Sequence, residues 1–388
     1  MVRGMVLPKS RKERRRRGYM KCYIATYYQY NNYGSRLQNF ALCQAIRKLG
    51  ADPVTLEIKS TKNTYKSRIK DLCSYFPIIH NRQCIWLNDR KKREEFRPFN
   101  NKLYLKKISY KKLYKIDFTD AIVIAGSDQI WSPSHMAKNK RDAKLYFLQF
   151  VPKEKRFTYA PSFGVKTIPN NLKSIYKEFL LEFTQLSIRE YDGQNIIKEL
   201  TNIQAPILPD PVFLLGKEEW KEVFSESETV LQNEKYIVTY FLSEHNEKVQ
   251  QEIERFAHIN QYKIVSIAGG FYRNGDEIPS PDEFVWLIDG AQAVFTDSFH
   301  ASAFSIIMET PFFVFKRNDV EQFSRIETLL HKFGCSAFVA GDETKLDDFN
   351  KDFKRNNNKE VEEKLSLERQ KGLLYLESML QKGKNGGI

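Results

Sequence analysis

The segment that most constrains the fold is Phe295–Arg317, because strand-like and helix-like patterns follow one another within it. The apolar run Ala291–Phe295 predicts a buried strand, Ala301–Glu309 a short helix, and Phe312–Phe315 the next strand. This order is typical of an open α/β sheet, in which ligands bind at the carboxyl ends of the strands. His300 falls where the helix opens, and there the free backbone N–H groups and the helix dipole favour an anion.

Two interpretations of this segment stay open from its residues alone. In the first, His300 caps a helix in an ordinary sheet protein. In the second, His300 lies in an anion site, and Lys316 and Arg317, which follow the second strand, face the same crevice.

The α/β pattern occurs twice along the 388-residue chain, which predicts two domains. We expect a disordered basic tail at 1–19, a Rossmann-like domain at 20–210, a second one at 211–340, and a helical segment at 341–388. A basic region at about 60–115 is expected to be a helical insertion in the first domain.

Apolar periodicity places the strands and helices within these domains. Predicted strands are Lys21–Tyr27, Pro53–Ile58, Ala121–Ala125, Leu145–Phe150, Phe157–Ala160, Leu186–Glu190, Tyr236–Leu242 and Tyr262–Ala268. Predicted helices are Gly34 to about Leu49, Glu247–Ile259, one opened by a capping box of Ser280 with Glu283, and Val361–Leu380. The last of these helices is expected to pack back across the first domain.

The formal net charge of +14 is concentrated in two regions. Residues 1–19 hold eight Lys or Arg against Glu13 alone, a charge of +7, and they lack the apolar core of a secretory signal. Residues 59–115 hold 17 basic residues against 4 acidic ones. This second region predicts either a solvated helical face or a surface that attracts anionic lipid head groups or phosphorylated substrates.

The five cysteines are scattered, with neither a C-x-x-C string nor a metal-ligand spacing with His. Their odd number suits a reduced cytosol. The sequence also has no apolar stretch of the ~18 residues that a transmembrane helix requires. We therefore expect a cytoplasmic protein without a metal or other cofactor.

Polar side chains follow two of the predicted strands. Gly126 permits a close approach of a ligand, and Ser127, Asp128 and Gln129 supply a hydroxyl, a carboxylate and an amide that suit a sugar. Alternatively, Asp128 ties the loop to its own backbone. Arg189, at the end of another predicted strand, either clamps a carboxylate or phosphate in bidentate fashion or forms a salt bridge.

Six strings of the chain, in this order, resemble the polysaccharide pyruvyl transferase family. They are Asn32-Tyr33-Gly34 with Leu37-Gln38, Gly126–Trp131, Ser187-Ile188-Arg189-Glu190, Asp210–Leu214, Ser298-Phe299-His300 and Ser324-Arg325-Ile326. The family usually has Gly after the His, where this chain has Ala301.

The resemblance implies an α/β fold of the glycosyltransferase-B-like kind, with two Rossmann-like domains facing across a cleft. It also implies a transferase that moves the carboxyethylidene (pyruvyl) group from phosphoenolpyruvate to a sugar of a cell-surface or exopolysaccharide precursor, forming a ketal. The acceptor sugar is not named by the sequence. A lipid-linked acceptor would bring the protein to the anionic inner face of the plasma membrane.

The same resemblance implies roles for single residues. His300 is the candidate acid or phosphate anchor, and Asp128 is the candidate proton acceptor. Arg189 and Arg325, with Lys316 or Arg317, are candidates for binding the donor's carboxylate and phosphate. Further candidate substrate-binding residues are Ser127, Gln129, Asn32 and Gly34.

Two functions of other classes stay open. One is a glycosyltransferase of the same fold that uses a sugar nucleotide, since a fold does not fix its function. The other is a nucleic-acid binder, which the basic charge suggests, although no nucleic-acid-binding motif is present and half of the charge lies in the tail.

Overall fold

The computed structural model describes residues 19–28, 32–58, 80–134, 140–224, 234–244, 246–269, 275–316, 323–335, 339–340, 346 and 358–384. Arg317 lies outside these ranges, as does the predicted tail apart from Tyr19.

The first half of the chain forms a parallel sheet of five strands in the order β3-β2-β1-β4-β5. The strands are β1 (Lys21–Ala25), β2 (Asp52–Ile58), β3 (Leu105–Ile108), β4 (Ala121–Ala125) and β5 (Arg156–Thr158). Lys21 of the central strand pairs with Asp52 on one side and with Ala121 on the other. Every residue of β4 is buried, as expected for a parallel sheet that is covered on both faces.

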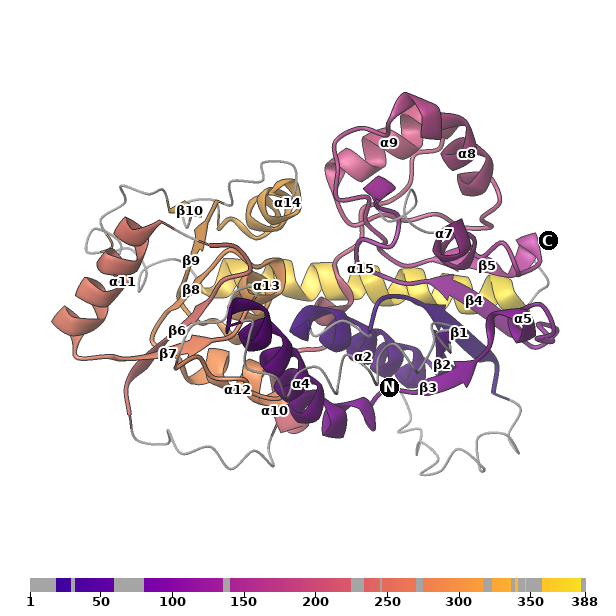
Figure 1. Cartoon of the computed structure of the whole chain (residues 1–388). Helices are drawn as coiled ribbons and strands as arrows, with labels where there is room; N and C mark the ends of the chain where they lie inside the picture. Colours follow the sequence, from indigo (N-terminus) through magenta and orange to yellow (C-terminus); the bar gives the residue numbers. More distant parts are fainter. Residues whose placement is uncertain are drawn as a thin grey trace, which may run out of the picture.

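The helices of the first half are α2 (Tyr33–Lys48), α4 (His80–Asn100), α5 (Tyr110–Leu113), α7 (Lys140–Tyr146), α8 (Asn170–Leu180) and α9 (Tyr191–Thr201), with a short 3₁₀ turn, η1 (Lys153–Lys155). Among them, α4 lies against the second half of the chain (Figure 1).

The second half repeats the architecture with a five-stranded parallel sheet in the order β10-β9-β8-β6-β7. Its strands are β6 (Tyr236–Tyr240), β7 (Lys263–Ile267), β8 (Val294–Thr296), β9 (Phe312–Phe315) and β10 (Val339–Ala340). Its helices are η2 (Pro211–Leu214), α10 (Lys217–Phe224), α11 (Glu247–Asn260), α12 (Pro281–Gly290), α13 (Phe299–Met308) and α14 (Ser324–Phe333). The predicted α/β fold with two Rossmann-like domains is confirmed.

Local signals in the sequence explain several helix ends. The predicted capping box at α12 is present, because Ser280 accepts from the backbone of Glu283 while the Glu283 side chain accepts from Ser280. At α13, Ser298 accepts from the N–H of Ala301, so His300 is the second residue of the helix. The helix predicted at Ala301–Glu309 is therefore present, but it begins two residues earlier and ends one residue earlier than predicted.

The long helix α15 (Asn358–Lys384) leaves the second half and crosses back over the first, as the yellow ribbon in Figure 1 shows. Leu376, Met379 and Leu380 are buried in one cluster with Ile24 and Ile122 of the first sheet. The predicted packing of the last helix across the first domain is thus observed. Among the described residues, no helix combines the length and the apolar character needed to cross a membrane.

The two halves interlock through aromatic side chains next to the start of α2. The ring of Tyr33 stacks on Phe284 of α12 with centroids 4.3 Å apart, and its hydroxyl donates to the carbonyl of Pro279 at 3.1 Å. Lys92 of α4 adds a hydrogen bond to the carbonyl of Gly269 at 2.8 Å. These contacts fix the first half against the carboxyl edge of the second sheet.

Three predicted segments differ from the structure. Leu145–Phe150 is no strand, because α7 ends at Tyr146 and the chain then turns, with Leu148 at a φ of 54°. The segment Leu186–Glu190 makes only an isolated bridge, from Ile188 to Ile207. The region 60–115, predicted to be helical, contains strand β3 on the edge of the first sheet. In all three, the local residue pattern does not determine the structure, because the outcome depends on which neighbouring strands are available for pairing.

Candidate functional site

The candidate site lies where the carboxyl edges of the two sheets meet. The loop after β4 and the loop after β8 both reach it, and helices α2, α9, α13 and α14 begin around it. In parallel sheets the loops after the strands collect at one edge, so residues far apart in the chain come together there.

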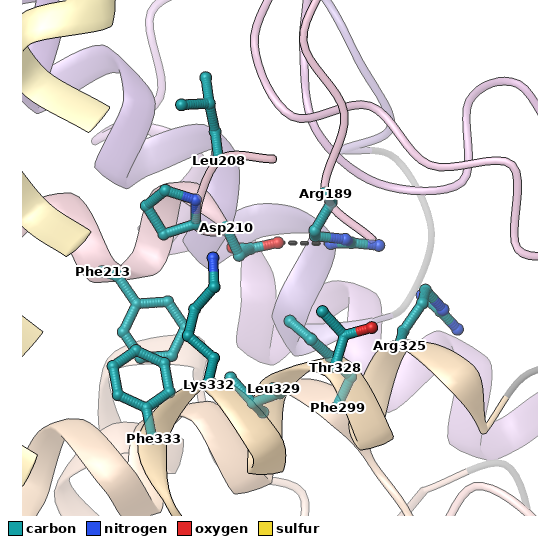
Figure 2. A pocket seen from close by; sticks show the side chains of 11 residues that line it. Arg189, Leu208, Asp210, Phe213, Phe299, Arg325, Thr328, Leu329, Lys332 and Phe333 are labelled. Carbon is teal, nitrogen blue, oxygen red and sulfur yellow. Dashed lines mark hydrogen bonds and ion pairs between the residues drawn. The ribbon is translucent and has the colours of Figure 1, made fainter. Parts of the chain in front are cut away.

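A buried ion pair between Arg189 and Asp210 is at the centre of the site (Figure 2). Their side chains are 3% and 0% exposed, and Nη1 of Arg189 donates to Oδ2 of Asp210. The same carboxylate accepts from the hydroxyl of Ser127 at 3.1 Å and from the N–H of Val212 at 3.1 Å. Asp210 thus joins the loop after β4, the segment before α9 and the start of η2.

Electrostatics keep this pair ionised. Burial alone raises the pKa of Asp210, but His300 and Arg189 outweigh it and hold the pKa well below the usual range of an Asp. Burial likewise lowers the pKa of Arg189, and the charges of Asp210, Asp128 and Glu190 raise it above its ordinary value.

His300 reaches the same carboxylate from the second half of the chain. Its Nε2 lies 3.6 Å from Oδ2 of Asp210, and its side chain is 10% exposed. The imidazole ring rests against Gly34 at the start of α2, where a Cβ atom would overlap the ring. Gly34 therefore serves the site by leaving room for His300 rather than by a polar contact.

Arg189 keeps donors that the protein does not use. Its Nε and Nη2 atoms are buried without a hydrogen-bond partner, and its guanidinium lies over the Phe299 ring at 4.7 Å from the centroid. Arg189, Asp210 and Phe299 line a pocket, together with Arg325 and Lys332 of α14. Unused guanidinium donors at such a pocket suit an anionic group.

Glu190 is a carboxylate whose charge interacts with those of Arg189 and Arg325. It is buried, and its Oε1 accepts from the hydroxyl of Ser162 at 2.9 Å and from the N–H of Phe163 at 3.0 Å. Burial raises the pKa of Glu190, while the charges of Arg189 and Arg325 act in the opposite direction.

Asp128 lies at the rim of this cluster. Its backbone is in the left-handed region, with a φ of 81°, which Asp tolerates better than most residues. Its Oδ2 accepts from the hydroxyl of Ser35 at 2.8 Å and its Oδ1 from the N–H of Gln129 at 2.8 Å. Asp128 thus ties its own loop, as the second alternative predicts, and it also contacts the start of α2. The binding of a sugar by this loop stays a prediction.

The structure brings together four of the predicted site residues around Asp210, namely Arg189, His300, Ser127 and, through packing, Gly34. Arg325 lines the adjoining pocket.

Other predicted substrate-binding residues make contacts within the protein, and their role in binding substrate stays a prediction. The Oδ1 of Asn32 caps α2 by accepting from the N–H of Ser35 at 3.3 Å, and the Gln129 side chain lies against Gly164. Lys316 is exposed at the end of β9, and its Nζ lies 5.4 Å from the centre of the Phe323 ring. It is not part of the pocket lining. Arg317 lies outside the described residues.

Sequence reasoning missed Asp210, Glu190 and Lys332. The available signal for Asp210 is its position between Pro209 and Pro211 at the junction of the two halves. Glu190 follows Arg189 directly, and its sequence position alone does not show that it is buried. Lys332 gave no local signal, because its place in the pocket depends on how α14 packs.

The arrangement suits the binding of an anion next to an imidazole. Arg189 and Arg325 line the pocket. His300 lies beside Asp210 next to them, and an imidazole can give or take a proton. In the described part of the chain, no group of three or more His, Cys, Asp or Glu side chains is placed to hold a metal ion.

Comparisons with known proteins agree with the strings found in the sequence. No curated protein matches the chain. The solved structures that resemble it include a UDP-GlcNAc 2-epimerase from Neisseria meningitidis, 11% identical, covering 95% of this chain and 97% of that chain with a TM-score of 0.45. They also include UGT89C1 from Arabidopsis thaliana, 10% identical, covering 94% of this chain and 100% of that chain with a TM-score of 0.43.

The decisive match is to the family model described as polysaccharide pyruvyl transferase, which spans residues 32–319. Because this match covers most of the chain and includes His300, Arg189 and Asp210, the protein belongs to the polysaccharide pyruvyl transferase family.

Proposed function

We propose that the protein transfers the carboxyethylidene group of phosphoenolpyruvate to a sugar of a cell-surface or exopolysaccharide precursor and forms a ketal. Family membership supports a transferase that acts on a polysaccharide. The observation that carries the proposed donor is Arg189, whose buried Nε and Nη2 atoms have no hydrogen-bond partner within the protein. Phosphoenolpyruvate has a carboxylate and a phosphate, so it can satisfy such donors.

The reaction requires one proton at the right carbon. Protonation of the terminal CH₂ of the enol gives a methyl group and makes the central carbon electrophilic. One sugar hydroxyl adds to this carbon, and a second hydroxyl displaces phosphate as the bond between the central carbon and the phosphate ester oxygen breaks. Of the two hydroxyl protons, one replaces the proton given to the methyl group and the other leaves with phosphate.

We assign the steps to residues that the site brings together. Arg189 and Arg325 hold the donor's anionic groups, and His300 either delivers the proton or anchors the phosphate. Asp210 orients both Arg189 and His300 through one carboxylate oxygen. Asp128, at the rim, accepts a proton from an acceptor hydroxyl.

The proposed acceptor places the protein in the cytoplasm, beside the inner face of the plasma membrane if the precursor is lipid-linked. The exposed lysines Lys106, Lys107, Lys111 and Lys112 of β3 and α5 would then favour an anionic membrane surface.

The donor is tested by incubating the protein with candidate glycans and phosphoenolpyruvate, and by searching the products for an added carboxyethylidene group with mass spectrometry. Parallel reactions with sugar nucleotides test the alternative donor. Phosphate release that depends on the glycan supports the proposal. Nucleotide release without a ketal would replace it by a glycosyltransferase reaction.

The role of His300 is tested with His300→Ala and His300→Gln. Loss of general acid catalysis lowers turnover by roughly 10²–10⁴-fold, and both variants should show it while still binding phosphoenolpyruvate. Activity that survives in the Gln variant and is lost in the Ala variant indicates a phosphate anchor, because an amide donates a hydrogen bond but delivers no proton. Full activity in His300→Ala would exclude His300 from the site.

A further inference from the structure

Lys332 is a cation of the pocket for which the reaction described above has no role. It lies on α14, and the spacing of Arg325, Thr328 and Lys332 places all three on one face of that helix. This face lines the pocket opposite Arg189 and Asp210, as Figure 2 shows.

The ammonium group of Lys332 is held in place by the C-terminal helix. Its Nζ lies 2.7 Å from Oε2 of Glu368 on α15, and the two side chains are only 13% and 11% exposed. An ammonium has three N–H donors, and this ion pair uses one of them. The other two donors belong to an ammonium group that the ion pair already orients and that is already shielded from water. Binding a ligand therefore loses little additional side-chain entropy.

Lys332 also follows the pattern of the other cations of the site. Arg189 is backed by Asp210, the charge of Arg325 acts on the buried Glu190, and Lys332 is backed by Glu368. In each case the carboxylate comes from a neighbouring element. A cation supported in this way stays charged in a buried place until a ligand arrives.

We propose that Lys332 binds the carboxylate or phosphate of the donor, and that Glu368 is the positioning residue that holds Lys332 in the pocket. This inference rests on the proposed function. Both residues lie beyond the matched range 32–319, so the second wall of the donor pocket comes from the C-terminal part of this chain.

The first test replaces Lys332 by Met and by Arg and measures phosphoenolpyruvate binding by calorimetry together with steady-state kinetics. A charged hydrogen bond to the donor predicts that Lys332→Met raises both Kd and KM for phosphoenolpyruvate by about tenfold or more. The value of kcat should change less. Lys332→Arg keeps the charge and should restore most of the affinity. If the Met variant does not fold, Lys332→Gln, which can still donate to Glu368, is measured in its place.

The second test separates positioning from mere packing by its pH dependence. The charged groups around Lys332 are Glu368 and Lys371 of α15 and Arg189, Asp210 and Arg325 at the pocket. Burial lowers the pKa of Lys332, and Glu368 is the group that raises it again. In Glu368→Gln the ammonium should therefore lose its proton at a lower pH, and KM for phosphoenolpyruvate should begin to rise at a lower pH than in the wild type. The matched control is Glu360→Gln, which breaks the exposed pair with Lys364 on the same helix and should leave the pH profile unchanged.

The outcomes distinguish the inference from the function on which it rests. Wild-type protein that binds no phosphoenolpyruvate overturns the proposed donor, and the inference with it. Wild-type binding that is equally tight in folded Lys332→Met overturns the inference alone. An unchanged pH profile in Glu368→Gln, with weakened binding in Lys332→Met, removes the positioning role of Glu368 and keeps Lys332.

Discussion

At the scale of single residues, Gly34 matters because of the side chain that it lacks. The imidazole of His300 occupies the volume that a Cβ at this position would fill. A side chain at Gly34 would therefore clash with His300, which explains the glycine in the Asn32-Tyr33-Gly34 string. The sequence alone did not reveal this contact, because His300 comes from the other half of the chain.

We expect Gly34→Ala to lower activity at least about tenfold and to destabilise the fold by about 1–3 kcal/mol, as overpacking does. Alanine favours a helix over glycine by about 1 kcal/mol, so a loss must come from the contact with His300. Chemical denaturation and turnover measure the two effects. The control is Gly216→Ala, where the nearest atom is the end of the Arg369 side chain at 3.4 Å and little change is expected. Equal behaviour of the two variants would contradict the steric role.

Asp210 accepts hydrogen bonds from three different segments, one of them carrying the charged Arg189, so its removal should be costly. Asp210→Asn leaves Arg189 buried without its counter-ion, and we expect a loss of about 3–5 kcal/mol at neutral pH. The exposed pair Lys263–Glu234 provides the control, because Glu234→Gln should cost less than about 1 kcal/mol.

The acid stability of the protein should depend on the same residue. The pKa of Asp210 in the folded state is depressed, so its stabilising contribution is present above the ordinary Asp value of ~3.9 and is lost as the pH falls from there towards the lower native pKa. Urea unfolding as a function of pH should therefore show a steeper loss of stability below pH ~4 in the wild type than in Asp210→Asn. Identical slopes would mean that other carboxylates dominate acid unfolding.

The sequence identified the site residues that have a distinctive chemistry and missed those that act by position. Arg189 and His300 were predicted as a candidate anion clamp and a candidate acid or phosphate anchor, and both lie in the cluster around Asp210. Asn32 was predicted to bind substrate, but its amide satisfies the first turn of α2, which is a local role that any Asn before a helix can have. Lys332 enters the pocket only through the packing of α14 on α15, which no local pattern encodes.

At the scale of the helices and strands, α15 contacts both halves of the chain and connects them. It carries Glu368 to the pocket and buries Leu376 and Met379 under the first sheet. Gly372 lets the helix approach closely, because a Cβ there would lie 2.5 Å from the hydroxyl of Tyr159 and 2.7 Å from Cδ2 of Leu214.

We expect Gly372→Ala to destabilise the protein by about 1–3 kcal/mol although alanine favours the helix. Tyr159 is fully buried. Thermal unfolding measures the effect, and Gln370→Ala on the exposed side of α15 is the control, with a change within about 0.5 kcal/mol. A stabilised Gly372→Ala would show that α15 packs more loosely against Tyr159.

Most strands and helices were predictable because their signals are local. The capping box of Ser280 and Glu283 sets the start of α12, and the uninterrupted apolar run Ala121–Ala125 forms the buried β4. Leu145–Phe150 has an equally apolar composition but ends a helix, because a short apolar run fits a buried strand or a buried helix and only the available partners decide.

At the scale of the whole molecule, the two halves are held in a fixed relation next to the site. The aromatic cluster of Tyr33, Phe96, Tyr240 and Phe284 joins α2 and α4 to the second half. The helix that begins with Tyr33 also presents Gly34 to His300, so the interface and the site share one turn of helix. The domain boundary predicted between residues 210 and 211 stays a prediction.

We expect the halves to unfold together, in one calorimetric transition. Tyr33→Ala should cost about 3–5 kcal/mol, as large aromatic truncations in a core do, and should lower the melting temperature of the whole chain. Tyr33→Phe removes only the hydrogen bond to Pro279 and should cost about 0.5–1.5 kcal/mol. Two separate transitions in Tyr33→Ala would show that each half is stable alone and that the cluster only couples them.

The contact between Gly34 and His300 also makes the imidazole a reporter of how the halves are aligned. The ring is seated against a backbone that belongs to the other half, so any sliding or parting of the two changes its magnetic environment at once. With only six histidines in the chain, the NMR signal of His300 can be assigned by its disappearance in His300→Gln. That single resonance would then follow domain alignment during turnover without a dye, a spin label or an added ligand.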